Sequence, residues 1–336
     1  MITPTDLQVS LFQSIKGKVN GVTPFVDEIA KLLNISSDSA YRRIRGDKAI
    51  TFEELYLLAN HYRLSLDTLM QVKTDIIPFQ GKYVDPASFR FEEYLLAVGQ
   101  QVKYMASFKE RTMYYLCKDI PLFHHYQFKH LAAFKYFFWH KTMLQSPSFV
   151  TKKVSLKDYP DEIFELGRKA LETYNQLDSV EIWNIESLNS TLRQVEFYHD
   201  AKAFQSDKDL LLVYESLEAL FTHLEIQAEL GYKFDSQNPE RKVLAGFQMY
   251  INEVVIGDNS ILAVLDKSKL AFLVHTGMNF MLTRDIDFCE NMYGYYHNLM
   301  RKSTLISSVS ERERSRFFKV LRNRIAARKQ NLKVSG

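Results

Sequence analysis

The segment Phe25–Met70 constrains the fold of this chain more than any other part of the sequence. Apolar residues recur at helical spacing over Phe25–Leu33, and the following Asn34 tolerates the left-handed conformation that ends a helix sharply. Ser36 is then a favourable N-cap for a second helix, Ser37–Arg45. The pattern therefore predicts two helices joined by a tight turn.

The residues after this turn predict two more helices. Gly46 ends the second helix, and Thr51 with Glu54 has the spacing of a capping box at the start of a third. Leu64–Met70 is expected to close the segment with a short last helix.

The helix Ser37–Arg45 has one inward and one outward face. Ala40 and Ile44 lie one turn apart and should face the core, so at about 100° per residue Arg42 points directly away. A short second helix after a tight turn fits a recognition helix in the major groove of DNA, with Arg42 on a guanine and the neighbouring arginines on phosphates. The predicted DNA-binding residues are Ser37, Asp38, Ser39, Arg42, Arg43 and Arg45.

These elements resemble the lambda-repressor-like, or Xre, family of DNA-binding domains over roughly the first 70 residues. The matching stretches are Glu28–Ser36, Tyr41–Gly46, and Leu55–Leu69 with its Leu64–Asp67 step; Asp6–Val19 would supply the family's first helix. Two positions depart from the family pattern, which usually has a glycine at Asn34 and a glutamine at Val26. The resemblance implies a helix-turn-helix domain that binds double-stranded DNA.

The charge of this segment bears on how tightly one copy could bind. Residues 1–72 hold eight Lys or Arg and eight Asp or Glu, so the segment has no general basic patch. One neutral module with a single short reading helix buries little DNA surface, which favours a homodimer on two half-sites.

The remaining sequence predicts a mainly α fold. We expect the chain to divide into a helix-turn-helix domain 1–72, a linker 73–85, a helical domain 86–235, and a small α+β effector or dimerisation unit 240–336. A long helix is expected from Pro86 to Lys118. Alternating residues near 247–283 predict three or four strands in a short antiparallel sheet, followed by the helices Ile286–Lys302 and Glu311 to about Gln330.

The composition narrows the class of protein further. There is no signal peptide and no apolar run near 18 residues, so a cytoplasmic protein without a membrane segment is expected, with Cys117 and Cys289 as free, buried thiols. The 19 Tyr and 24 Phe favour either a core or a ligand pocket. His124, His125, His130 and His140 lack carboxylate or cysteine neighbours at ligand spacing, so core or surface roles are expected and no metal or cofactor.

The C-terminal residues are basic. Residues 301–336 carry eleven Lys or Arg and two Glu. This helix could be a second nucleic-acid contact, although a solvated helix docked on its own domain is favoured.

No phosphate-binding loop, nucleophile elbow or His-Glu metal spacing is found, so no enzyme is expected. The sequence predicts a sequence-specific transcriptional regulator that binds DNA as a homodimer. Its C-terminal region is expected either to sense a small-molecule or peptide effector or to form the dimer. The alternative is a protein-interaction adaptor in which the arginines form a solvated face of a protein-binding bundle.

Overall fold

The computed structural model describes residues 3–16, 24–64, 66, 76–81, 84–86, 88–238, 240–254 and 257–334. The chain divides into two compact units, Met1–Pro78 and Phe79–Gly336. Most of the expected helix 64–70, and residues 73–75 and 82–83 of the expected linker 73–85, lie outside the described residues.

The first unit contains four described helices: α1 (Pro4–Lys16), α2 (Phe25–Leu33), α3 (Ser37–Ile44) and α4 (Phe52–His61). Asn34 ends α2 in the left-handed conformation, with φ 53°. Thr51 and Glu54 form the predicted capping box of α4. The core comprises Leu11, Phe12, Ile15, Ile29, Ala30, Leu33, Ala40 and Leu58.

Polar contacts tie α1 to the turn between α3 and α4. The side-chain amide of Gln8 donates to the backbone carbonyls of Arg43 and Lys48 at 2.7 and 2.8 Å. Its Oε1 accepts from the backbone N–H of Ile50 at 3.1 Å. One side chain thus makes three hydrogen bonds to the backbone at the end of α3 and in the turn that follows it.

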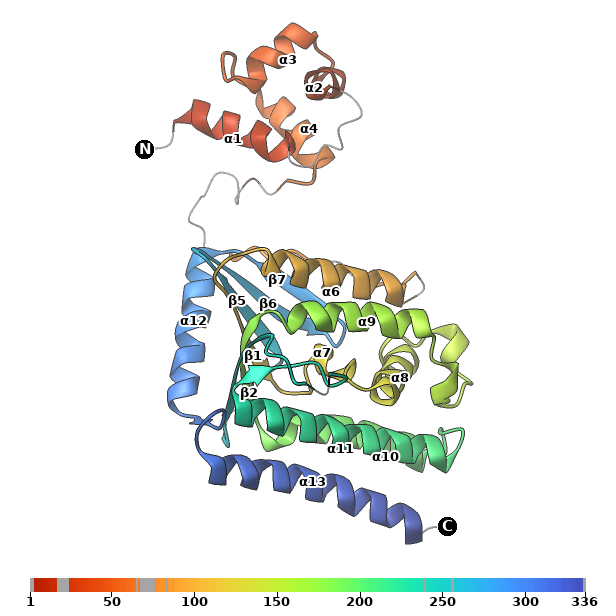
Figure 1. The fold of residues 1–336 in the computed structure, drawn as a ribbon. Coiled ribbons are helices and arrows are strands. Elements are labelled where there is room, and N and C mark those ends of the chain that lie inside the picture. Colours follow the sequence, from red (N-terminus) through yellow and green to blue (C-terminus); the bar gives the residue numbers. More distant parts are fainter. Residues whose placement is uncertain are drawn as a thin grey trace. The chain divides into compact units, whose positions relative to one another are not determined.

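The second unit is a mixed sheet covered by helices on both faces (Figure 1). Its helices are α6 (Phe91–Ala106), α7 (Leu122–His125), α8 (Lys129–Phe138), α9 (Asp161–Tyr174), α10 (Asn189–Asp200), α11 (Asp207–Leu230), α12 (Ile286–Arg301) and α13 (Glu311–Val334). Its strands are β1 (Arg111–Cys117), β2 (Asp178–Trp183), β3 (Tyr232–Lys233), β4 (Ala245–Ile251), β5 (Ser260–Leu265), β6 (Ser268–Thr276), β7 (Asn279–Thr283) and β8 (Thr304–Leu305).

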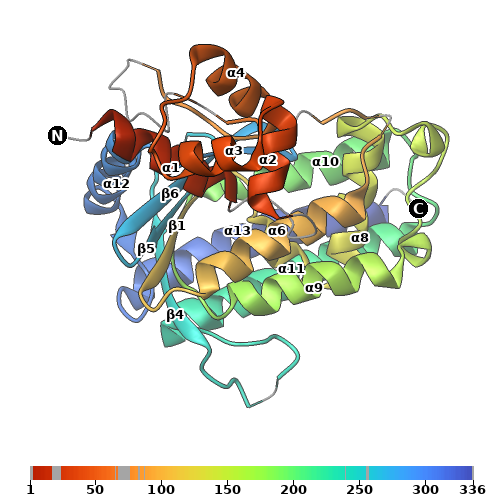
Figure 2. The same cartoon turned by 90° about the horizontal axis from the view of Figure 1, so that it is seen from above.

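The strand order is β3-β4-β2-β1-β5-β6-β7, and β8 pairs with β4. The central strands β1, β2 and β4 are parallel, whereas β5, β6 and β7 continue as an antiparallel meander. Figure 1 shows α12 on one face of the sheet and α6 to α11 on the other. Figure 2 shows α6, α9 and α11 extending from the same side of the sheet.

The predicted mainly α fold with a short antiparallel sheet is wrong. The expected helix Pro86–Lys118 is instead α6 followed by β1, and β2 was not predicted at all. β4 was expected in the meander, yet it pairs with β2 on the far side of β1. Segments 86–235 and 240–336 therefore supply strands to one sheet within one compact unit.

Two further sequence expectations can be compared with the structure. Cys117 and Cys289 are free and buried, as predicted. Among the described residues, no helix combines the length and apolar character needed to span a membrane.

Glu181 of β2 is a fully buried carboxylate at the centre of the sheet. It accepts hydrogen bonds from Trp183 Nε1 at 2.7 Å and from the Tyr174 hydroxyl, and its Oε1 lies 2.8 Å from His124 Nε2. Burial alone would raise the pKa of Glu181, but His124 and Tyr174 hold this pKa below its ordinary value. The carboxylate thereby joins β2 to α7 and α9.

The buried amino group of Lys233 packs against the ring of Tyr174, the residue whose hydroxyl donates to Glu181. Its Nζ donates to the carbonyls of Tyr174 and Leu177 at 3.0 and 2.8 Å and lies 3.5 Å from the centroid of the Tyr174 ring. Burial lowers the pKa of Lys233 to about 7, although Glu181 and Asp178 oppose the shift. This contact fixes the end of α9 against β3.

Glu181→Gln should lower the free energy of unfolding of the second unit by about 2 kcal/mol, because the amide leaves a buried donor facing another donor. Chemical denaturation of the full chain measures the change. Glu186→Gln is the matched control, since its ion pair with Arg324 is 60% exposed on the glutamate side and should contribute about 0.5 kcal/mol. Equal losses for the two variants would contradict the structural role of Glu181.

Candidate functional site

The predicted orientation of α3 is confirmed. Ala40 is fully buried, and Ile44 packs against the same core. The Ser36 hydroxyl accepts from the Ser39 backbone N–H at 3.3 Å, so the helix begins at the predicted N-cap. Arg42 consequently lies on the exposed face.

Arg43 corrects the predicted set of DNA-binding residues, because its side chain is buried. Its Nε and Nη2 atoms donate to the two carboxylate oxygens of Glu54 at 2.8 and 2.7 Å, and Nη1 donates to the Ser39 hydroxyl at 2.6 Å. The hydrogen bond from Arg43 lowers the pKa of Glu54. Because Glu54 also caps α4, this pair clamps α3 onto α4.

The three residues at the start of α3 differ in what they offer to a partner. Ser37 is exposed and donates to Asp27 Oδ1 at 2.9 Å, which connects α3 with α2. Ser39 is partly buried and holds the Arg43 guanidinium. Asp38 is exposed. Ser37 and Ser39 therefore have structural roles in addition to their place at the predicted interface.

The exposed face of α3 centres on Arg42, Arg45 and Tyr41. No ion pair or side-chain hydrogen bond of Arg42 occurs within the described part of the chain, whereas Arg45 lies 3.6 Å from Asp47. The Arg45 guanidinium also lies 5.6 Å from the centroid of the Tyr41 ring, which is 48% exposed. Sequence reasoning missed Tyr41, although its spacing of four residues from Arg45 could have indicated this contact.

The basic helix α13 is docked on its own unit. Lys329 pairs with Glu218 of α11 at 2.7 Å, and Arg324 lies 3.2 Å from Glu186. Arg322 pairs with Glu225, also of α11. Phe317, Phe318, Leu321 and Ile325 lie in the core. These contacts support the docked helix over a second nucleic-acid contact.

The histidines considered for a metal lie mainly in the core. His124 bonds to Glu181, whereas His125 and His140 are buried beside aromatic rings. Among the described residues, no group of three or more His, Cys, Asp or Glu side chains could hold a metal ion.

Comparison of the chain with family models, curated proteins and solved structures returned no match.

Arg43→Ala should destabilise the first unit by about 3 kcal/mol, because it leaves the Glu54 carboxylate partly buried and unpaired. Hydrogen exchange of the full chain, followed by mass spectrometry of peptides from α3 and α4, measures this loss as faster exchange. Arg42→Ala removes an exposed arginine from the same helix and should leave the exchange unchanged. Identical protection in the two variants would show that the clamp does not stabilise α3.

Proposed function

We propose that this protein is a sequence-specific DNA-binding regulator of transcription whose recognition helix is α3. The observation that carries the proposal is the combination of an exposed Arg42, which has no side-chain partner among the described residues, with a buried Arg43–Glu54 clamp beside it on α3. A side chain that reads a base must be presented on a rigid support. The four-helix arrangement and the resemblance to the Xre family support the same function.

The contacts to DNA divide into two kinds. In this proposal Arg42 makes a bidentate contact with O6 and N7 of a guanine in the major groove. Arg45, the C-cap residue of α3, makes a phosphate contact that carries no sequence information. Tyr41 adds apolar surface beside Arg45, suited to the sugar-phosphate backbone or to a thymine methyl group.

Arg42→Ala should weaken binding to the preferred duplex by about fivefold to 150-fold, through the loss of about 1–3 kcal/mol of base discrimination. Fluorescence anisotropy with duplexes selected from a random pool by the unaltered protein measures the affinity. Arg42→Lys keeps the charge but cannot make the planar bidentate contact, so it should lose most of the discrimination too.

Arg301→Ala is the matched control, because it removes one exposed arginine from α12 in the second unit. Its affinity should equal that of the unaltered protein. Unchanged affinity of both Arg42 variants would reject α3 as the recognition helix.

We further propose that the protein binds DNA as a homodimer. The first 72 residues are neutral overall, and a single α3 offers few contacts at physiological salt, so two modules on half-sites one helical turn apart would supply the required affinity. Anisotropy titrations at DNA concentrations well above the dissociation constant should give two chains per selected duplex. One chain per duplex would contradict the dimer.

A further inference from the structure

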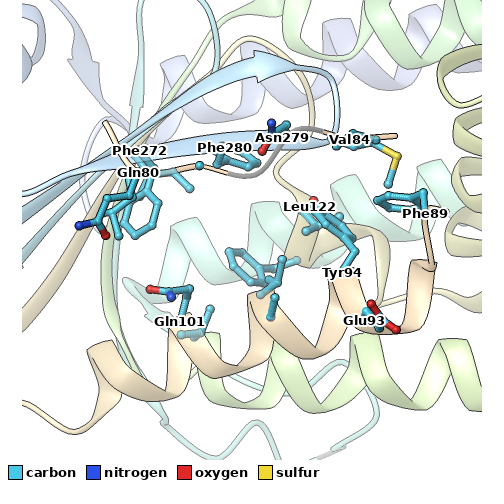
Figure 3. Close-up of a pocket in the computed structure, with 18 of the residues that line it drawn as sticks. Gln80, Val84, Phe89, Glu93, Tyr94, Gln101, Leu122, Phe272, Asn279 and Phe280 are labelled. Atoms are coloured by element: carbon cyan, nitrogen blue, oxygen red, sulfur yellow. The ribbon is translucent and has the colours of Figure 1, made fainter. Parts of the chain in front are cut away.

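A cavity of about 670 Å³ lies in the second unit between α6 and the sheet. Strands β1, β5 and β6 line one side, and the segment around Gln80, Val84 and Phe89 lines another. Figure 3 shows Tyr94 and Gln101 projecting from α6 into the space below Phe272 and Phe280. Both its volume and its placement between a helix and a sheet are typical of small-molecule sites.

The wall of the cavity is apolar and rich in aromatic rings. Six aromatic residues line it: Phe89, Tyr94, Tyr115, Phe123, Phe272 and Phe280. Its charged lining residues are Asp85, Arg90 and Glu93. Arg90 is the one cation among the described lining residues, and it lies 3.6 Å from Glu93 with both side chains about two-thirds exposed or more (67% and 72%). Within the described residues, an anion bound among the rings would therefore have no buried counter-charge.

Two tyrosine hydroxyl groups supply hydrogen-bond donors in the otherwise apolar wall. Tyr115 of β1 is 2% exposed and Tyr94 projects from α6, and both line the cavity. Neither hydroxyl has a hydrogen-bond partner within the described residues. Both phenols are O–H donors at neutral pH, and burial raises the pKa of each further above its ordinary value. Because both side chains line the cavity, an acceptor atom of a bound molecule can take a hydrogen bond here.

We propose that this cavity binds an uncharged, largely apolar aromatic molecule whose carbonyl or hydroxyl oxygen accepts a hydrogen bond from Tyr115. The rings of the wall would stack on such a molecule, and the missing counter-charge would exclude carboxylates and phosphates.

The wall also includes the part of the chain that follows directly on the first unit. Gln80 exchanges two backbone hydrogen bonds with Leu282 at the end of β7, at 2.7 and 2.8 Å, and both residues line the cavity. A bound molecule would therefore contact the segment that leads out of the first unit. An effect of this contact on DNA binding would rest on the function proposed above. Binding of the small molecule to the cavity does not rest on it.

Fluorescence titration of the full chain, without DNA, tests the site with two probes that share one ring system. The first is 6-propionyl-2-dimethylaminonaphthalene, an uncharged ketone, and the second is 6-dimethylamino-2-naphthoate, the corresponding carboxylate. The ketone should bind saturably at one site per chain, and the carboxylate should bind at least about tenfold more weakly. Absence of saturable ketone binding, or equal affinity for both probes, would overturn the proposal.

Two pairs of variants locate the bound ketone. Val98→Trp fills the cavity from α6 and should abolish binding, whereas Leu96→Trp changes a 50% exposed residue of the same helix and should not. Tyr115→Phe should weaken binding about threefold to tenfold through the lost hydrogen bond. Tyr114→Phe, on the opposite face of β1, should leave the affinity unchanged.

Circular dichroism would reveal whether Val98→Trp prevents folding. In that case the comparison of Tyr115→Phe with Tyr114→Phe still tests the site. Undiminished binding to a folded Val98→Trp, or equal affinities of the two phenylalanine variants, would overturn the assignment of this cavity. A normal DNA affinity in the same preparations would show that the failure concerns the ligand site alone.

Discussion

The carboxylate of Glu181 sets the arrangement of the second unit, because a buried charge must be matched by donors from the elements that cover it. His124 of α7, Tyr174 of α9 and Trp183 of β2 provide these donors. Because these polar groups must lie next to Glu181, the apolar core on this face of the sheet is interrupted at its centre. One residue on, Ile182 faces the other side and packs in the core beneath α12. The parallel strands thus have buried side chains on both faces.

In the first unit, the ion pair between Arg43 and Glu54 holds α3 against α4. This pair determines which arginines of α3 are accessible to a partner. Arg43 and Glu54 saturate each other, and Glu54 also caps α4. The clamp leaves Arg42 on the exposed face, one residue away. Arg43 therefore fixes the position of α3, and the adjacent Arg42 is the exposed side chain that this helix presents. A protein-interaction adaptor would not require a single arginine to be held so rigidly, although such an arginine would be compatible with that function.

The sequence predicted what depends on neighbouring residues and missed what depends on distant ones. The end of α2 at Asn34 and the capping box of Thr51 follow from local chemistry. Strand β2 is buried on both faces and lacks the alternation that would distinguish it from a buried helix segment. Arg43 was misassigned because nothing local shows that Glu54, eleven residues further on, lies beside it. The two phenols that line the cavity, Tyr94 and Tyr115, likewise come together only when α6 packs on β1.

We propose that the outward face of α3 contacts DNA bases. Photochemical crosslinking of the full chain to a selected duplex with 5-bromouracil at single positions, followed by mass spectrometry of the crosslinked peptides, measures these contacts. We expect crosslinks within Ser37–Arg45, at positions that follow the sequence preference. Crosslinks confined to α13, or specific binding with no crosslink in the first unit, would contradict it.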